Sequence, residues 1–441
     1  MISTVGYFVV TLLILILVHE FGHFIVARCC GVTVQRFSFG FGTVLWSWQD
    51  KKGTEYAWSL WPLGGYVKLL DDSQGPVPVA QQSRAFHHQS AIIQIAIILA
   101  GPLFNFLFAF VVLGIVAVIG VTSLAPMIDE VIPHSVAAQA GLGEKQEIIE
   151  LDHHAVSSWQ QVQDVLLPLL SAKRAVVVTM KSLRNGQITQ RNLGLSQVPL
   201  DPQHATLFER IGVVPMFPKS TPVVETVTEG SPAQRAGLQP EDEILSIDHQ
   251  FMTDSMKVVA YIKARPAATI VLEVKRHGHA QQLIAHLPVA TGYLGIGLRS
   301  PSVPADWVRV NQVGPIQAVK LAFKQTLNLT AMTFGFLGQM LTGQLPLEHL
   351  SGPIGIARAA DASAHAGLIA YLTFLALLSV SLGVLNVLPI PMLDGGHLLY
   401  CMLEIVTRRP LSLAFKSKSA FVGTLVIVAM SMVALKNDLR Y

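Results

Sequence analysis

The chain has 441 residues, of which 51% are hydrophobic and only 13% are charged. This composition is too apolar for an ordinary soluble protein. The formal net charge of +3 is too small to indicate a nucleic-acid partner, so we expect none. The three cysteines are too few and wrongly spaced for a disulfide framework or a zinc ribbon. The sequence therefore indicates a membrane protein with a more polar middle region.

Four apolar segments are long enough to cross a lipid bilayer as helices, at about residues 5–26, 91–121, 368–388 and 421–435. The first lacks the basic flank of a signal peptide, so we expect it to remain as a spanning helix. Lysines and arginines are concentrated between spans one and two and between spans three and four. The positive-inside rule places these two segments in the cytoplasm, and the termini and the middle region on the other side.

The first span contains the sequence His19-Glu20-Phe21-Gly22-His23, an HExxH pattern. Residues four apart share one face of a helix, so His19 and His23 can present two imidazoles to one zinc ion. Glu20 can then serve as the general base that activates water. Ionisable side chains are costly inside a membrane and mark functional sites there. A structural pair of histidines hydrogen-bonded to a neighbouring Glu is the alternative interpretation.

The middle region contains an internal repeat with an offset of 96 residues, from Gly141 to Gly237. Residues 135–142 align with 231–238, and residues 148–153 align with 244–249. Each copy predicts a short helical turn closed by Gly, followed by a strand that ends in an Asp-His turn. The offset has the size of a small domain, so the pattern indicates a tandem duplication rather than a solenoid.

Both copies resemble the PDZ domain, whose common core is A-G-L-x-x-x-D-x-I-x-x-I-D. The second copy fits well, whereas Gly-Glu-Lys-Gln at residues 143–146 replaces the usual x-P-G-D in the first. The short strands near Gly212 and Gly295 follow the helical core, which implies a circular permutation. By this resemblance the domains would bind a peptide by strand addition. Domains that act only as spacers or size filters are the equal alternative.

A catalytic zinc site needs a third protein ligand. The candidate is Asp394, in the segment from Asn386 to His397 (N-V-L-P-I-P-M-L-D-G-G-H) that closes the third span. Its prolines break the helix, and Gly395-Gly396 permits a tight turn. His397 competes with Asp394 as a ligand. We favour Asp394, because a carboxylate completes two-histidine sites in known zinc peptidases, and expect His397 to be structural.

HExxH in the first span together with N-x-x-P-x-P-x-L-D-G in the third is the double signature of the site-2 protease family of intramembrane zinc metalloproteases. With its tandem PDZ-like domains, the chain resembles the bacterial sigma-E regulator proteases of that family over nearly its whole length. By this resemblance His19, His23 and Asp394 are the Zn²⁺ ligands, and Glu20 is the base. Asn386 would hold the substrate backbone or steady the developing charge.

Two further segments match motifs of this family. Residues 61–69, with Gly64, Gly65 and Tyr66 at their centre, correspond to a β-element that enters the membrane and pairs with the unwound substrate. A hairpin at the membrane interface is the alternative. A Gly-Pro-Leu-Phe-Asn motif in span two ends at Asn105, which is either an interhelical hydrogen-bonding group or a support for catalysis.

The expected fold is a polytopic α-helical membrane protein of about four spans, with two periplasmic α+β PDZ-like domains inserted between spans two and three. We expect an interfacial helix or helix pair, rather than a fifth span, at residues 313–343 because Lys320 and Lys324 lie there. The expected parts are an N-terminal membrane part (1–124), two PDZ-like domains (125–218 and 219–305), the interfacial helices (306–367) and a C-terminal membrane part (368–441).

The expected function is zinc-dependent cleavage of single-span membrane proteins in a bacterial inner membrane, near the cytoplasmic side. By the family resemblance, the substrate is an anti-sigma factor of envelope-stress signalling already shortened by another protease, or remnant signal peptides. The PDZ pair would exclude uncut substrates or bind the new C-terminus. The alternatives are a PDZ scaffold with an inactive protease core, which the intact Glu20 opposes, and a metal transporter. A transporter would need polar residues along several spans, whereas here they lie in two motifs.

Overall fold

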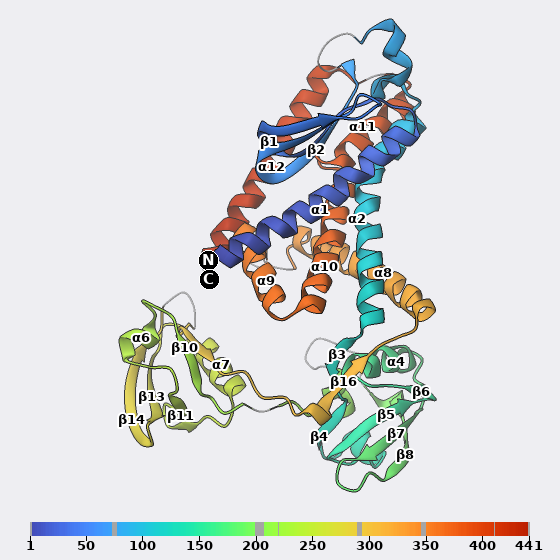
Figure 1. Cartoon of the computed structure of the whole chain (residues 1–441). Coiled ribbons are helices and arrows are strands. Elements are labelled where there is room, and N and C mark those ends of the chain that lie inside the picture. Colours follow the sequence, from blue (N-terminus) through green and yellow to red (C-terminus); the bar gives the residue numbers. More distant parts are fainter. Residues whose placement is uncertain are drawn as a thin grey trace. The chain divides into compact units, whose positions relative to one another are not determined.

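The computed structural model describes residues 2–72, 77–198, 207–218, 220–288, 293–344, 350–409 and 411–439. The chain forms two compact units (Figure 1). Residues 1–121 and 312–441 form the first, here called the membrane unit, and residues 122–311 form the second, the β unit.

Four helices of the described residues are long and apolar enough to span a membrane, as predicted. They are α1 (Ile2–Cys29), α2 (Ala91–Ile119), α10 (Leu368–Val387) and α12 (Leu413–Asp438). Helix α12 is longer than the expected segment 421–435. It begins after Ser412, whose side chain accepts a hydrogen bond from the Phe415 amide, and Lys416 and Lys418 continue it because lysine is a good helix former.

Three other helices of the membrane unit are α8 (Pro315–Leu341), α9 (Pro353–His365) and α11 (Asp394–Thr407). The amphipathic segment expected at 313–343 forms one continuous helix, α8, which is not among the candidate spans. Its buried Ala318 and Ala322 allow close packing, and α8 contacts α2 and α10. Two short 3-10 helices, η2 (Val79–Arg84) and η3 (Phe86–His88), precede α2.

Strands β1 (Val34–Gln49) and β2 (Glu55–Leu69) form an antiparallel pair that curls on itself. Phe37 in β1 pairs with Val67 on one side and with Tyr56 on the other. The bend in β1 falls at Gly40 and Gly42, which both have φ of 89°, a backbone conformation that glycine adopts without strain. The second half of β2 therefore lies at one edge of this small sheet.

The first domain of the β unit is built around a five-strand path, β8-β7-β5-β4-β9, with β6 paired to β5. Its core contains Ile128, Leu151, Val162 and Met180, all almost fully buried. Its elements are β4 (Met127–Val131), α3 (Val136–Gln139), β5 (Gln146–Leu151), β6 (His154–Ala155), α4 (Trp159–Ser171), β7 (Val176–Ser182), β8 (Ile188–Leu193), η4 (Leu195–Gln197), α5 (Leu207–Ile211) and β9 (Val213–Pro215).

The second domain has the same order of strands and of the first two helices around its own core, as expected for a tandem repeat, and its described residues hold no counterpart of η4 or α5. Its sheets are β12-β11-β13-β14 and β10-β15. In both domains the last strand pairs with the first, β9 with β4 and β15 with β10. Its elements are β10 (Val224–Val227), α6 (Pro232–Ala236), β11 (Glu243–Ile247), β12 (Gln250–Phe251), α7 (Ser255–Lys263), β13 (Thr269–Arg276), β14 (His279–His286) and β15 (Ile296–Leu298).

A two-stranded ribbon joins the beginning and the end of the β unit. Strand β3 (Val121–Leu124) pairs with β16 (Val308–Asn311), which follows the 3-10 helix η5 (Ala305–Trp307). Ala125 N–H donates to the Trp307 carbonyl at 2.8 Å, and the Asn311 amide donates to Ser123 Oγ at 2.7 Å. The two strands therefore run antiparallel, and the chain leaves the β unit beside the point where it begins.

Candidate active site

The two histidines of the HExxH pattern lie side by side on α1. His19 Nε2 and His23 Nε2 are 3.3 Å apart, as expected for residues one helical turn apart. Gly22, between them, lies against the backbone of α2, where a Cβ atom would overlap the carbonyl of Ala100. The absence of a side chain at Gly22 therefore lets α2 approach the helix that carries both imidazoles.

Asp394 is the first residue of α11, directly after the proline-containing break that follows α10. Both following glycines are helical, and neither has a positive φ; the residue with a left-handed backbone is Met392, with φ of 85°. A Cβ on Gly395 would overlap the carbonyl of Leu388, and one on Gly396 would lie 2.5 Å from the carbonyl oxygen of Ile390. The expectation that Gly395-Gly396 makes the turn was therefore wrong: these glycines allow close packing that places Asp394.

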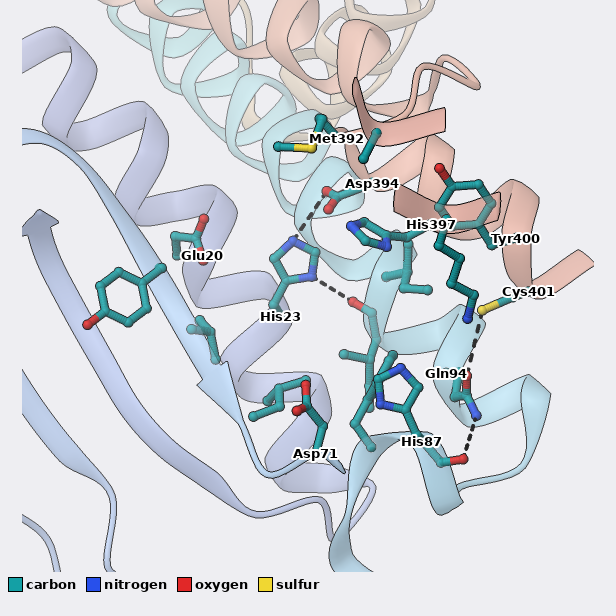
Figure 2. A pocket seen from close by; sticks show the side chains of 18 of the residues that line it. Glu20, His23, Asp71, His87, Gln94, Met392, Asp394, His397, Tyr400 and Cys401 are labelled. Carbon is teal, nitrogen blue, oxygen red and sulfur yellow. Dashed lines mark hydrogen bonds and ion pairs between the residues drawn. The ribbon is translucent and has the colours of Figure 1, made fainter. Parts of the chain in front are cut away.

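The structure brings His19, His23 and Asp394 together, and they are the one group of described residues with metal-ligand geometry. Asp394 Oδ2 lies 3.1 Å from His19 Nε2 and 3.3 Å from His23 Nε2. Figure 2 shows the Asp394 carboxylate directed toward the His23 ring. Ligands about 2.0–2.1 Å from a tetrahedral zinc ion lie about 3.3 Å from each other, so the three atoms fit one ion. Asp394 Oδ2 is buried and has no hydrogen-bond partner among the described residues, as expected for a metal ligand.

The other nitrogen of each imidazole is held by α2. His23 Nδ1 lies 2.7 Å from the carbonyl oxygen of Ile97, and His19 Nδ1 lies 3.1 Å from the amide Nδ2 of the fully buried Asn105. A Cβ on Gly101 would overlap the His23 ring, so this glycine gives the imidazoles their room. Asn105 is thus an interhelical hydrogen-bonding group that contacts one of the metal-ligand candidates.

Glu20 lines a cavity of about 570 Å³ together with His19, His23 and Asp394 (Figure 2). Polar groups from four elements continue the cavity wall away from the three ligand candidates. They include Asp71, His87, Gln94, His397, Tyr400, Cys401, Glu404 and Lys416. Sequence reasoning did not single out this polar wall, apart from His397, because its members come from separate segments. Tyr400, Cys401 and Glu404 share one face of α11 with His397, and this helical spacing was the signal that could have found them.

The second half of β2 borders the same cavity. Tyr66 and Val67 line it, and a Cβ on Gly65 would lie 3.6 Å from Glu20 Cγ and 2.8 Å from the Ser38 carbonyl oxygen. The Tyr66 ring stacks on Phe41, which occupies the space beside Gly64. The predicted β-element is therefore formed by β1 and β2, and its edge lies next to Glu20.

Two other candidates lie apart from the ligand cluster. His397 lines the cavity but does not belong to the metal-ligand group. Asn386 is buried, 8% exposed, near the end of α10, and it is not among the residues that line the cavity. The structure thus favours Asp394 over His397 as the third ligand candidate, and the substrate role of Asn386 stays a prediction.

The family model of peptidase family M50 matches residues 7–430, nearly the whole chain. The chain belongs to peptidase family M50. It is an intramembrane metalloprotease of the site-2 type, a family whose members are zinc enzymes. Its four apolar helices agree with a multi-pass membrane protein.

Curated relatives of this M50 chain cover nearly its full length. It is 38% identical over 437 residues to the regulator of sigma-E protease RseP of Salmonella typhimurium strain 14028s, covering 98% of this chain and 97% of the relative. It is 37% identical over 438 residues to RseP of Escherichia coli K12, with the same two coverages. A putative zinc metalloprotease of Vibrio cholerae is 36% identical over 439 residues, covering 98% and 97% of the two chains.

Proposed function

We propose that His19, His23 and Asp394 bind one catalytic zinc ion and leave its fourth position to water and substrate. The observation that carries this proposal is the convergence of three ligand atoms, separated by 3.1–3.3 Å, beside a cavity that Glu20 also lines. Bound there, zinc would polarise the scissile carbonyl and lower the pKa of a water molecule.

Glu20 is proposed as the general base. It follows His19 directly on α1 and borders the cavity that must hold the scissile bond. Its carboxylate would take a proton from the attacking water, whose oxygen adds to the carbonyl carbon of the substrate. The same carboxyl group would then give this proton to the amine nitrogen when the C–N bond breaks.

Asn105 and the Ile97 carbonyl are proposed to orient the two imidazoles. His23 Nδ1–H donates to the Ile97 carbonyl oxygen, so the Nε2 lone pair of His23 faces the metal position. Asn105 Oδ1 has no hydrogen-bond partner among the residues that the structure describes, while its Nδ2 faces His19 Nδ1. With the amide turned by 180°, Oδ1 accepts from His19 Nδ1–H, which frees the His19 Nε2 lone pair in the same way.

Residues 65–69 of β2 are proposed as the element that pairs with substrate. A transmembrane helix hides its amide groups in internal hydrogen bonds, so it must become extended before water can attack. The exposed edge of a sheet supplies hydrogen-bonding groups to such an extended segment. Gly64, Gly65 and Tyr66 lie at this edge, and Gly65 is next to Glu20. Asn386 remains a proposed contact to the substrate backbone.

The proposed substrate is a single-span membrane protein, cut within the bilayer near its cytoplasmic side. The names of the relatives support a sigma-E regulator, so we propose an already shortened anti-sigma factor as the main substrate and remnant signal peptides as further ones. The basic residues between spans one and two support a cytoplasmic position for β1 and β2. The protein would then lie in a bacterial inner membrane, with its β unit in the periplasm.

The two domains of the β unit are proposed to be PDZ-like domains that keep uncut substrates from the active site. The repeated order of elements and the pairing of the last strand with the first support the PDZ resemblance. Capture of a new substrate C-terminus by strand addition is the alternative role.

The decisive experiment measures cleavage of a model single-span substrate by the purified full-length protein, with and without a zinc chelator. Glu20→Gln should lower the rate by at least about 10²–10⁴-fold while zinc content stays at the wild-type value, because the ligands remain and the base is lost. Chelation should stop cleavage by the wild type. Substantial turnover by the Glu20→Gln protein would refute the role of Glu20.

Zinc content tests the third ligand separately. Asp394→Ala should lower both zinc occupancy and cleavage, because it removes one of three ligands and leaves two histidines. His397→Ala is the matched control, since it lies in the same helix and cavity but outside the ligand cluster. Zinc loss in His397→Ala with full occupancy in Asp394→Ala would show that the ligands are assigned wrongly.

Cysteine labelling tests the orientation in the membrane. In a variant without Cys29, Cys30 and Cys401, a cysteine at Ser182 in β7 should react with an impermeant reagent added to cells with a permeable outer membrane. A cysteine at Gln81 in η2 should react only after the inner membrane is opened. The reverse pattern would invert the proposed topology.

A further inference from the structure

A second cavity of about 660 Å³ lies beside the helix that carries the HExxH pattern. It is bordered by α1, α2 and the β1–β2 pair, and none of its lining residues lines the active-site cavity. We call it the aromatic groove because eight of its twelve lining residues are aromatic. They are Phe21, Phe24, Phe37, Phe39, Trp48, Tyr56, Phe104 and Phe108, and the other four are Leu17, Val18, Leu107 and Val111.

The distance from Arg28 to the inner end of the aromatic groove matches the thickness of one leaflet of a bilayer. Along α1 the lining residues begin at Leu17 and end at Phe24, one turn before Arg28. At 1.5 Å per residue, the distance from Leu17 to Arg28 is about 16 Å. The hydrocarbon of one leaflet is about 15 Å thick, half of a core of about 30 Å. An acyl chain whose headgroup lies near Arg28 would therefore reach the inner end of the groove.

Positive charge is concentrated at the Arg28 end. The Arg28 guanidinium donates to Tyr56 Oη at 3.1 Å and pairs with Asp50 at 2.9 Å. Lys51 and Lys52 follow Asp50 in the exposed turn between β1 and β2, and neither forms an ion pair with the residues that the structure describes. Arg28, Lys51 and Lys52 together with Asp50 carry a net positive charge, which favours an anionic group at this end.

We propose that the aromatic groove binds an acyl chain of one anionic phospholipid, with its phosphate near Arg28, Lys51 and Lys52. The bound lipid would fill the space between α1 and the hairpin, on the side of α1 that does not face the active site.

The test is retention of phospholipid by the purified full-length protein, followed by native mass spectrometry after exchange with phosphatidylglycerol or phosphatidylcholine. The wild type should retain one phosphatidylglycerol in preference to phosphatidylcholine. Lys51→Gln with Lys52→Gln should weaken retention of phosphatidylglycerol by roughly 30-fold, because each lysine near a lipid surface contributes to binding. Lys320→Gln with Lys324→Gln, two lysines of α8, is the control and should retain lipid as the wild type does.

A second variant tests the groove itself. Val111→Trp, at a half-exposed lining position, should fill the inner end and abolish retention of either lipid, whereas Val422→Trp on α12 should not. The thermal unfolding temperature in lipid-free detergent shows whether each variant is folded. Equal retention of the two lipids, or unchanged retention in the Lys51→Gln, Lys52→Gln protein, overturns the proposal. So does a photocrosslinker at Val111 that captures substrate instead of phospholipid.

Discussion

In both domains of the β unit a serine begins the short helix and a glycine ends it. Ser135 Oγ accepts from the Ala138 amide at 3.1 Å, and Ser231 Oγ accepts from the Gln234 amide at 3.2 Å. The final strand of each domain brings a glycine with positive φ, Gly212 or Gly295, against that serine, where a Cβ would overlap it. The duplication has therefore kept the backbone, including the positions where a side chain does not fit.

The charges that hold this backbone differ between the two domains. In the second, Asp242 is fully buried and accepts from the Gln239 amide at 2.8 Å and from Arg276 through both oxygens at 2.7 Å. In the first, the neutral Gln146 occupies the equivalent position and accepts only from the Gly143 amide, at 3.3 Å. The second domain thus closes its turn with a buried internal ion pair, whereas the ion pair of the first domain's turn, between Lys145 and Asp129, uses an exposed lysine.

The buried acid of the first domain is Glu147, and its partner lies outside that domain's own strands. Arg309 on β16 donates to both carboxylate oxygens of Glu147 at 2.8 Å. The first domain is therefore fastened to the strand through which the chain leaves the β unit, whereas the second is held together within itself. The two domains thus place the partner of their buried acid differently, and we expect substitutions at the two ion pairs to change stability by different amounts.

Removal of both domains should have the largest effect. Because β3 and β16 are antiparallel, residues 126–306 can be replaced by a short Gly-Ser linker between Ala125 and Trp307. If the domains exclude uncut substrates, the shortened protein should cleave full-length single-span substrates at least about tenfold faster than the wild type, because the proposed zinc ligands lie in the membrane unit. The two rates are measured side by side in one detergent.

Glu20→Gln in the shortened protein is the control for contaminating proteases. A docking role predicts the reverse result, with slower cleavage of pre-shortened substrates and no gain on intact ones. Slower cleavage of the pre-shortened substrate without faster cleavage of the intact one would therefore refute the proposal that the domains exclude uncut substrates.

The second-largest effect should be a difference in stability between the turn at Asp242 in the second domain and the turn at Gln146 in the first. Asp242→Ala leaves Arg276, only 18% exposed, without its partner, so we expect the second domain to lose roughly 3–5 kcal/mol of unfolding free energy. Gln146→Ala, the equivalent change in the first domain, removes one long neutral hydrogen bond and should cost about 1 kcal/mol or less. Hydrogen exchange of β11 and of β5 in the full-length protein reports the two stabilities. Equal losses would show that the ion pair is not what distinguishes the domains.

Local sequence patterns predicted much of this molecule. The apolar segments gave the four spans, the helical spacing gave the His19–His23 pair, and the repeat gave the order of strands in both domains. Asp394 was proposed as the third ligand from its place in the proline-containing segment that closes the third span, from zinc-ligand chemistry and from the family resemblance. No local pattern connects it to His23, because 371 positions separate the two residues. The close placement of these side chains depends on the packing of α11 against α2.

Other features follow from tertiary packing and leave no local pattern. In the curled β1–β2 pair, Phe37 of β1 is paired with β2 residues on both sides. This arrangement depends on two parts of β2 contacting the same residues of β1. The contact between Asn105 and His19 depends on how α1 crosses α2, which is why the sequence left two roles open for Asn105. Met392 has a left-handed backbone, but methionine rarely adopts this conformation, so the residue type did not indicate it.

A smaller effect is expected at the attachment of the first domain. Arg309→Met leaves the buried Glu147 without its partner and should cost roughly 1–3 kcal/mol, expressed as faster hydrogen exchange in β4 and β5 but not in β11. In a double-mutant cycle with Glu147→Gln, the second substitution should add little to the first, because both remove one interaction. Additive costs would show that Glu147 and Arg309 do not stabilise the domain through each other.

The smallest effect should appear in the pH dependence of the second domain. Burial alone raises the pKa of Asp242, but hydrogen bonds from Arg276 and from the Gln239 amide outweigh it, and the pKa lies below its ordinary value. A carboxyl group whose pKa is lower in the folded state stabilises that state fully above the unfolded value, about 3.9, and loses this contribution as the pH falls through the folded value. Pulsed hydrogen exchange should therefore show β11 and β13 losing protection below about pH 4 in the wild type. Asp242→Asn should be less stable at pH 7 but should lack this acid-dependent loss. The same loss below pH 4 in Asp242→Asn would assign the titration to another group.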